Sequence, residues 1–413
     1  MKYKIEHDSV YDELVERGYL DECTHEEDLK ELLKTKKVPF YIGFDATADS
    51  LTIGHFVQIM VMMRMQAHGH KPVALLGGGT TMIGDPSGRS DMRMVMTKER
   101  IDYNAQRFYE QLQRFIDFGD DKAIVVNNSD WLLDLNFVNF MREIGVHFNV
   151  NEMLKKDAYK TRLEKGLTFF EFSYMLMQSY DYLVLYRKHG CRIQMGGSDQ
   201  WSNILSGAEL VKKHENEQVY AMTFKLLTRA DGQKMGKSMK GAIWLDENKT
   251  SAYELFQYMR NTDDRDVKKF LNLLTFVPTS EIEELTQYND ERINKAKEVL
   301  AYEIVKLVHG KDKAEEALET SKALFNKGTA DDNMPTTEVK YSEFEDVKGL
   351  LSLLTFTGIT KSNGEARRLV QQGGIRLNDE KIEDTRYELT EDMLKEGVII
   401  QKGKKVFHKI ILK

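Results

Sequence analysis

Three polar side chains on one predicted helix could together form a ligand site. A long helix is predicted over residues 168–189, in LTFFEFSYMLMQSYDYLVLYRKHG, and its apolar residues cover almost every face, as in a buried helix. Tyr174, Gln178 and Asp181 nevertheless recur at i, i+4 and i+7, so they share one stripe. A buried carboxylate is costly unless it has a partner. The stripe indicates either an internal hydrogen-bond network or a pocket for a small polar ligand. Asp85, which follows another strand and also needs a partner, favours the pocket.

A helix that begins at Gly54 and His55 could bind an anion. In FDATADSLTIGHFVQIM (44–60) turn residues precede this pair and an apolar run follows it. Ser or Asp would cap a helix better, so free backbone N–H groups and a partial positive charge would face a ligand such as phosphate. An ordinary helix start is the alternative that these residues alone leave open.

Two glycine-rich loops carry further candidates. GGGTTMIGDPSGRSDMR (77–93) holds Arg89 and Arg93, and arginines on such a loop can close over a polyphosphate. The loop lacks the Walker spacing, and a plain surface loop is the alternative. In QMGGSDQWSN (194–203) two glycines at a strand end precede Asp199 at a helix start. This pattern suits a nucleoside whose ribose hydroxyls bond the carboxylate, or a simple helix cap.

A pair of lysines stands in a loop rich in turn residues. Lys234 and Lys237 flank Gly236 in ADGQKMGKSMKGAIWL. Mobile lysines can neutralise negative charge that develops on a phosphate in a transition state. A solvated loop without a function is the alternative.

Apolar strands that alternate with helices predict a parallel sheet in α/β layers, with ligands at the carboxyl ends of the strands. The predicted strands are 38–44, 71–76, 123–128 and 191–196. The predicted helices are 1–35, 54–68, 97–118, 168–189 and one from Asp199. We expect a Rossmann-like domain over 1–225, a helical domain with the lysine loop over 226–326, a linker over 327–346 and a small α+β domain over 347–413.

The composition is that of a soluble globular protein: the 413 residues are 41% hydrophobic and 30% charged. No apolar run approaches the roughly 20 residues that span a bilayer, and the N-terminus lacks the apolar core of a signal peptide. Cys23 and Cys191 have no metal-ligand spacing and favour a reducing cytoplasm. The net charge of −7 argues against indiscriminate DNA coating. Residues 361–413, however, hold 12 Lys and Arg against 9 Asp and Glu, which hints at a nucleic-acid module.

Five motifs stand in one order along the chain. They are YIGFDATADSLTIGH, IGDPSG, EFSYMLMQSYD, GGSDQWSN and KMGKS. Together they resemble the bacterial-type tyrosyl-tRNA synthetases, which are class I aminoacyl-tRNA synthetases: the first motif is similar to that family's segment ending in HIGH, and the last to KMSKS. The tail SNGEARRLVQQGGIRLNDEKIED resembles the alpha-L RNA-binding module of the same enzymes. The resemblance covers nearly the whole chain.

The resemblance implies a role for each matching residue. Hydrogen bonds to the phenolic hydroxyl of tyrosine would come from Tyr41 and Asp181. The α-ammonium would be held by Asp85, Tyr174 and Gln178, and Gln200 would lie by the carboxylate. The nucleotide would be bound by Gly43, Asp45, Thr47, Gly54, His55, Gly197, Asp199 and Lys237. Charge around pyrophosphate would come from Lys234, Lys237, Arg89 and Arg93, assisted by Thr52 and His55. Phosphates of RNA would be contacted by Arg367, Arg368, Arg376 and Lys381.

Three positions depart from the family pattern. Thr52 stands where the HIGH motif has its first histidine, so it can donate a hydrogen bond to ATP but cannot be cationic. Ile42 replaces a cysteine that some relatives place near the ribose, and Arg89 replaces a lysine, which keeps the charge. The departures concern rate and not the fold.

The implied activity is that of a tyrosine–tRNA ligase. L-Tyrosine and ATP would give tyrosyl-adenylate and pyrophosphate, and the tyrosyl group would pass to the 3′ end of tRNA(Tyr). Mg²⁺ would arrive with ATP, since no Asp, Glu, His or Cys cluster indicates a protein metal site, and no organic cofactor is expected. The expected partners are tRNA(Tyr), L-tyrosine, ATP and a second copy in a homodimer, without membrane or DNA. A tryptophan-specific sister synthetase and a non-catalytic RNA-binding relative are the alternatives, and Thr52 is the one feature in favour of the latter.

Overall fold

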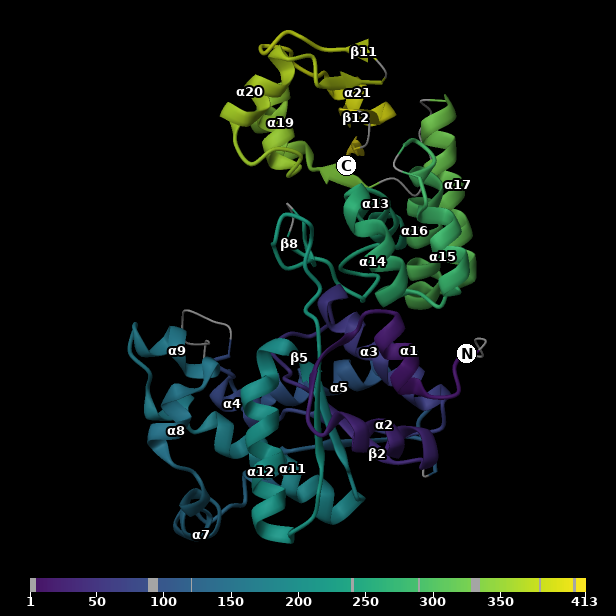
Figure 1. Ribbon diagram of the computed structural model, residues 1–413. Helices are drawn as coiled ribbons and strands as arrows, with labels where there is room; N and C mark the ends of the chain where they lie inside the picture. The colour runs from purple at the N-terminus through teal and green to yellow at the C-terminus, as the bar shows by residue number, and fades with distance from the viewer. Residues whose placement is uncertain are drawn as a thin grey trace. The chain divides into compact units, whose positions relative to one another are not determined.

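The computed structural model describes residues 5–87, 96–119, 121–238, 241–288, 290–327, 335–378, 380–403 and 406–413. The chain divides into two compact units, 1–235 with 269–279 and 236–268 with 280–413 (Figure 1). Residues 269–279, predicted to lie in the helical domain, thus return to the first unit. Arg89 and Arg93 lie outside the described residues.

A six-stranded sheet forms the centre of the first unit. Its order is β1-β6-β5-β2-β3-β4, with β1 (Leu20–Cys23), β2 (Pro39–Phe44), β3 (Lys71–Leu76), β4 (Ile124–Asn127), β5 (Ile193–Gly197) and β6 (Tyr220–Phe224). All neighbours pair in parallel except β1, which is antiparallel to β6. From β2 the chain adds strands on one side through β3 and β4, and later on the other through β5 and β6. The sheet therefore has its topological switch point between β2 and β5, where such folds bind ligands.

The helices of the first unit cover this sheet, as the predicted Rossmann-like class requires. Buried side chains of α11 and α12, such as Leu183 and Val211, form one core with Tyr41, Val73 and Leu75 of β2 and β3. The helices of this part are α1 (Val10–Glu16), α2 (Glu26–Thr35), α3 (Ile53–Ala67), α4 (Thr80–Ile83), α5 (Lys98–Leu112), α6 (Ser129–Leu132), α7 (Phe137–Glu143), α8 (Val150–Lys155), α9 (Asp157–Leu163), α10 (Phe169–Phe172), α11 (Tyr174–His189) and α12 (Trp201–Glu215). Two 3₁₀ turns lie at Gly145–His147 and Ser198–Gln200. The predicted α/β class is confirmed.

Two helix predictions in this unit are wrong. Residues 1–35 do not form one helix, because Gly18 takes a positive φ of 80° after α1 and the chain continues as the edge strand β1. The helix predicted over 168–189 is divided at Ser173, whose hydroxyl donates to the carbonyl of Phe170 and competes with the helix backbone. As a result Phe169 is 65% exposed and not buried.

The second unit contains helices and a small sheet. Its first part holds the hairpin of β7 (Lys237–Ser238) and β8 (Gly241–Ala242). The helices that follow along the chain are α13 (Ala252–Arg260), α14 (Asp264–Leu274), α15 (Thr279–Thr286), α16 (Ile293–His309) and α17 (Lys311–Lys327), and α14 enters the first unit from residue 269 on. No helix among the described residues is both long and apolar enough to cross a membrane.

The C-terminal part is an α+β structure around its own apolar core, which includes Leu353, Val370, Ile400 and Ile410. The sheet order is β11-β10-β12-β13-β9, with β9 (Thr336–Val339), β10 (Ile375–Leu377), β11 (Glu380–Lys381), β12 (Val398–Lys402) and β13 (Val406–Leu412). The helices are α18 (Phe344–Val347), α19 (Leu350–Phe356), α20 (Asn363–Gln371) and α21 (Glu391–Glu396), with a 3₁₀ turn at Tyr341–Glu343. The predicted linker 327–346 is therefore wrong in its second half, because β9 pairs in parallel with β13.

A buried cluster of charges ties the N-terminus to helix α3. The carboxylate of Glu13 on α1 is paired with Arg64 of α3, and its Oε2 lies 2.8 Å from His68 Nε2. Arg64 is fully buried and also donates to the carbonyl of Thr275 at 2.5 Å. Tyr19 donates to the carbonyl of Leu273 at 2.6 Å, so the returning segment is anchored at two points. Burial alone would raise the pKa of Glu13, but His68 and the neighbouring arginines outweigh it and lower the pKa to about 2.

We predict that Glu13→Gln lowers the free energy of unfolding by about 3 kcal/mol at pH 7, because it leaves buried cations without their anion. A carboxyl group with a lowered pKa stabilises the fold above its unfolded pKa of about 4.5 and loses that contribution as the pH falls toward 2. Urea unfolding at several pH values should therefore show the difference between variant and wild type shrinking from pH 4.5 to 2. Glu110→Gln, in an exposed pair with Arg107, is the control and should cost less than about 1 kcal/mol. A pH-independent difference would contradict the assignment.

Candidate functional site

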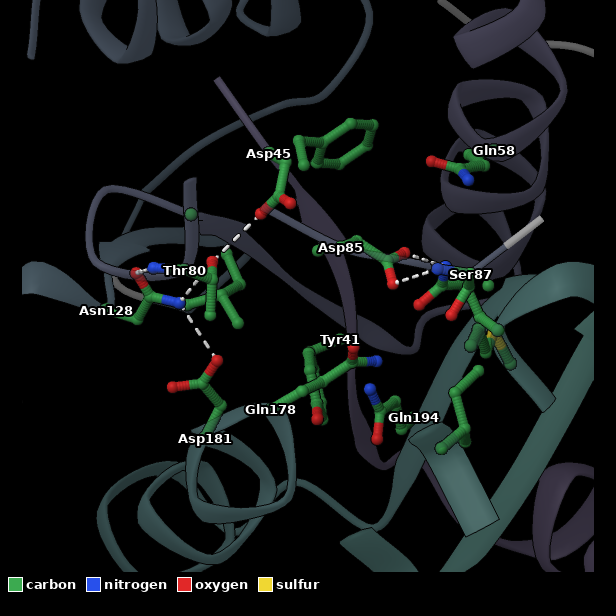
Figure 2. A pocket seen from close by; sticks show the side chains of 18 of the residues that line it. Tyr41, Asp45, Gln58, Thr80, Asp85, Ser87, Asn128, Gln178, Asp181 and Gln194 are labelled. Atoms are coloured by element: carbon green, nitrogen blue, oxygen red, sulfur yellow. Dashed lines mark hydrogen bonds between the residues drawn. The ribbon is translucent and has the colours of Figure 1, made fainter. Parts of the chain in front are cut away.

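A cavity of about 220 Å³ opens at the switch point of the sheet, lined by the carboxyl ends of β2 and β5 and by α11 (Figure 2). Eleven predicted site residues line it: Tyr41, Gly43, Asp45, Thr47, His55, Asp85, Tyr174, Gln178, Asp181, Asp199 and Gln200. The stripe predicted on the helix thus faces a cavity, as the pocket alternative required. Four of these side chains are carboxylates, so the cavity suits a ligand with an ammonium group.

Asp181 lies at one end of the cavity with neutral donors around it. It is 1% exposed, and its Oδ2 accepts from Asn128 Nδ2 at 2.9 Å while its Oδ1 accepts from Trp131 Nε1 at 2.8 Å (Figure 2 draws the first of these bonds). Burial raises the pKa of Asp181 to about 8, although both hydrogen bonds act to lower it. The Asn128 amide cannot reverse, because its Oδ1 accepts from Gly79 N at 2.7 Å. The site therefore presents a fixed acceptor.

Three buried polar atoms around the cavity have no hydrogen-bond partner among the described residues. They are the hydroxyl of Tyr41 and the Oε1 atoms of Gln178 and Gln194, and Figure 2 shows these side chains close together. Burial, together with the nearby Asp181, raises the pKa of Tyr41, so its hydroxyl keeps its proton and can donate. Buried polar groups are normally paired, and these atoms therefore point to a polar ligand.

Two further carboxylates are held by their neighbours. Asp45 accepts from Thr80 Oγ1 at 2.9 Å and from the Tyr174 hydroxyl at 3.0 Å. Asp85 accepts from Gln200 Nε2 at 2.5 Å and from the backbone N–H of Ser87 at 2.9 Å. Tyr174, predicted to contact the amino acid, and Asp45, predicted to contact the nucleotide, thus meet directly. Both predicted subsites share one cavity.

The start of helix α3 differs from the prediction. The helix begins at Ile53 with Thr52 as its N-cap, and it is not bare: the backbone N–H of Thr52 donates to Nδ1 of His55 at 3.0 Å. This bond leaves Nε2 as the position where a neutral His55 ring carries its proton. His55 lines the cavity, but Thr52 and Gly54 are not among the lining residues. A Cβ at Gly54 would meet only Thr52 Oγ1 at 3.5 Å, so the protein itself does not require glycine there.

The other residues predicted on the nucleotide side are Asp199, Gly197, Lys234 and Lys237. Asp199 forms an ion pair with Lys234, whose Nζ lies 3.4 Å from Asp199 Oδ2 and whose side chain is mostly exposed. A Cβ at Gly197 would lie 2.8 Å from Asp199 Oδ1, so a side chain at this position would require Asp199 to move. The backbone of Lys237 belongs to β7 in the second unit, and its side chain lies outside the described residues.

The basic residues predicted to contact RNA lie in the C-terminal part. Arg367 and Arg368 are exposed on α20. Arg376 and Lys381 are cross-strand partners of β10 and β11. The Lys381 side chain passes over Gly373, just after α20, because a Cβ there would lie 2.1 Å from Lys381 Cε.

Sequence reasoning missed several residues of the site. Asn128 and Trp131 hold Asp181, Thr80 holds Asp45, and Gln194 lines the cavity beside Gln178. Asn128 directly follows the predicted strand 123–128, and the rule that ligands gather at the carboxyl ends of parallel strands could have singled it out. Trp131 carries no such signal.

Comparisons with known proteins agree with this geometry. A family model described as tRNA synthetases class I (W and Y) matches residues 33–326, and one described as a tyrosine–tRNA ligase SYY-like C-terminal domain matches residues 326–410. The tyrosine–tRNA ligase of Acetivibrio thermocellus is 56% identical over 98% of this chain and 99% of its own length. The tyrosine–tRNA ligase of Lachnoclostridium phytofermentans is 55% identical over 97% of this chain and 98% of its own length.

A solved structure is similar over most of its length. A C-terminally truncated mitochondrial tyrosyl-tRNA synthetase of Aspergillus nidulans superposes with a TM-score of 0.69 at 31% identity, covering 77% of this chain and 95% of that one. The chain belongs to the class I tRNA synthetases of the tryptophan and tyrosine type. The predicted family is confirmed.

We predict that Tyr41→Phe raises the free energy of unfolding by about 1 kcal/mol, because it removes a buried hydroxyl that lacks a partner among the described residues. Tyrosine should bind about 10-fold more weakly, since one hydrogen bond to its phenol is lost. Urea unfolding and calorimetric titration measure the two effects. Tyr182→Phe is the control: its hydroxyl donates to the Tyr220 carbonyl at 2.8 Å, so its loss should destabilise the fold. A clear loss of stability in Tyr41→Phe would show that its hydroxyl is already paired.

Proposed function

We propose that this chain activates L-tyrosine with ATP and transfers the tyrosyl group to the 3′ end of tRNA(Tyr). The family and the relatives at 53–56% identity over nearly the full length support the predicted tyrosine–tRNA ligase activity. The choice of substrate rests on two groups that together suit a phenol: the fixed acceptor Asp181 and the Tyr41 hydroxyl, for which the described part of the chain provides no partner.

The amino acid is bound between two sets of polar groups. Its phenolic hydroxyl donates to Asp181 and accepts from Tyr41. The α-ammonium of tyrosine is held by Asp85, Tyr174 and Gln178, because the cavity is acidic near Asp85. Gln200 lies beside the carboxylate of the tyrosine substrate. Phenylalanine would leave the Tyr41 hydroxyl unpaired and would give Asp181 no hydroxyl donor, and a hydrogen bond that a buried group fails to make costs on the order of 1–3 kcal/mol.

The nucleotide lies on the other side of the shared cavity. Asp199 forms a hydrogen bond with the ribose. The nucleotide is contacted by Gly43, Asp45, Thr47 and Gly197. Gly54 leaves room for the nucleotide. The tyrosine carboxylate is already ionised, so the first step needs no general base, and catalysis comes from positioning and from charge. That charge around pyrophosphate comes from Lys234, Lys237, Arg89 and Arg93. Thr52 and the Nε2–H of His55 add hydrogen-bond donors. Mg²⁺ enters as part of the ATP substrate.

Two partner assignments complete the proposal. The basic residues of the C-terminal part contact tRNA phosphates. A second copy of the chain covers an apolar surface of the first unit, where Phe137 and Phe169, which are 66% and 65% exposed, line a cavity of about 300 Å³. The cytoplasmic location and the division into three domains stay predictions.

Tyrosine-dependent exchange of pyrophosphate into ATP tests the first step. The wild-type chain should exchange with tyrosine, and neither phenylalanine nor tryptophan should replace it. Asp181→Ala should reduce tyrosine activation about 100-fold, because the hydrogen bond to the phenol and its fixed geometry are lost. Asp130→Ala, an exposed aspartate on α6, is the control.

The alternatives give different results in the same assay. Exchange with tryptophan would indicate the sister synthetase. No exchange with any amino acid would favour the non-catalytic RNA-binding relative and would direct attention to Thr52, to be tested by Thr52→His.

We predict that Arg367→Glu with Arg368→Glu leaves pyrophosphate exchange unchanged but raises the KM for tRNA about 10-fold or more. Removing phosphate contacts weakens RNA binding and also reduces its salt dependence. Charging assays at several salt concentrations measure both effects. Lys395→Glu, on α21 of the same C-terminal part, is the matched control. Unchanged tRNA kinetics would remove α20 from the RNA interface.

A further inference from the structure

The loop that joins β2 to α3 is held by side chains from elsewhere. This loop, residues 45–52, carries Asp45 and Thr47 on the nucleotide side of the cavity. At the start of the loop, the backbone N–H of Ala46 donates to Thr81 Oγ1 at 2.9 Å, and its carbonyl accepts from Asn104 Nδ2 at 2.8 Å. Both polar groups of the Ala46 backbone are therefore bound by side chains.

The far end of the loop is held in the same way. Gln111 Oε1 accepts from the backbone N–H of Leu51 at 3.0 Å and from the Ser50 hydroxyl at 3.2 Å. Ser50 and Gln111 are 0% and 3% exposed, so solvent does not compete for these bonds. The next residue, Thr52, caps helix α3. The position of Leu51 thus sets where His55 stands.

One helix supplies both of these amides. Asn104 and Gln111 are seven residues apart on α5, which is two turns and about 10 Å, so they lie on one face. Because the helix is rigid, it fixes the spacing between the two ends of the loop. Each amide also leaves one buried atom, Asn104 Oδ1 or Gln111 Nε2, without a partner among the described residues. An apolar side chain would avoid that cost, so packing alone does not account for the two amides.

We propose that Asn104 and Gln111 are positioning residues for the nucleotide step. Resting on the proposed function, this inference assigns them no contact with substrate. They hold loop 45–52 so that Asp45, Thr47 and His55 present their polar atoms to ATP. Asp181, at the phenol end, is instead held by Asn128, just after β4, and by Trp131 of α6.

The test separates ATP from tyrosine. Gln111→Met keeps the side-chain volume but removes the acceptor for the Leu51 N–H and the Ser50 hydroxyl. It should lower kcat/KM for ATP at least 10-fold in pyrophosphate exchange, because a displacement of about 1 Å in a reacting group can cost 100-fold in rate. Tyrosine binding without ATP, measured by calorimetric titration, should stay within twofold of wild type. Gln111→Glu, which keeps an acceptor oxygen, should recover part of the ATP kinetics. Gln106→Met, exposed on the same helix, is the matched control.

A gentler variant guards against misfolding. Ser50→Ala removes one of the bonds to Gln111, together with the bond from the Ser50 hydroxyl to the Leu51 carbonyl, and keeps the bond from the Leu51 N–H to Gln111. It should raise the KM for ATP about twofold to threefold. Wild-type ATP kinetics in folded Gln111→Met, or an equal loss of tyrosine binding, would overturn the inference while leaving the proposed function intact. A wild-type chain without tyrosine-dependent exchange would overturn both.

Discussion

A wholly buried carboxylate surrounded by neutral donors governs this site. Among the described residues no cation offsets the burial of Asp181, and its pKa is accordingly raised to about 8. Asn128 and Trp131 orient it, and Asn128 is itself fixed by the backbone of the loop after β3. Such an arrangement is unfavourable without a ligand and becomes favourable when a hydroxyl completes it. We therefore regard the phenol end of the cavity as a site whose burial cost is offset by substrate binding.

The architecture concentrates these groups at one edge of the sheet. Residues from β2, β4, β5 and the helices after them meet there because parallel strands end on the same side. Four carboxylates in one cavity suit an ammonium group but oppose a polyphosphate. In the proposed mechanism, cations at the rim of the cavity offset the repulsion between these carboxylates and the polyphosphate. Lys234 is one such cation among the described residues: its side chain is mostly exposed, and its Nζ lies 3.4 Å from Asp199 Oδ2.

Periodicity and strand order predicted most of this arrangement. The i, i+4, i+7 spacing of Tyr174, Gln178 and Asp181 placed them on one face, and the loop motifs brought Asp85 and Asp199 to the same edge. The failures have physical causes. Strand β1 was hidden because an edge strand with exposed Asp21 and Glu22 lacks the apolar run of a buried one. The break at Ser173 depends on one local hydrogen bond, which periodicity does not detect.

Other features could not be read from the sequence because they depend on contacts between distant segments. Trp131 reaches Asp181 across 50 positions, and Gln111 reaches Leu51 across 60. Strand β9 lies in a segment of linker-like composition and is defined only by its pairing with β13. The cap at Thr52 looked absent because the ring of His55, not an acidic or hydroxyl side chain, accepts its backbone N–H.

Calorimetric titration of the wild-type chain with L-tyrosine and with L-phenylalanine, in the absence of ATP, tests the central claim most directly. If Asp181 and Tyr41 recognise the phenol, phenylalanine should bind on the order of 100-fold more weakly, since the Tyr41 hydroxyl stays unpaired and Asp181 gains no donor from the ligand. Comparable affinities for the two amino acids would contradict this account, because the groups at the end of the cavity would then not distinguish a hydroxyl from a hydrogen.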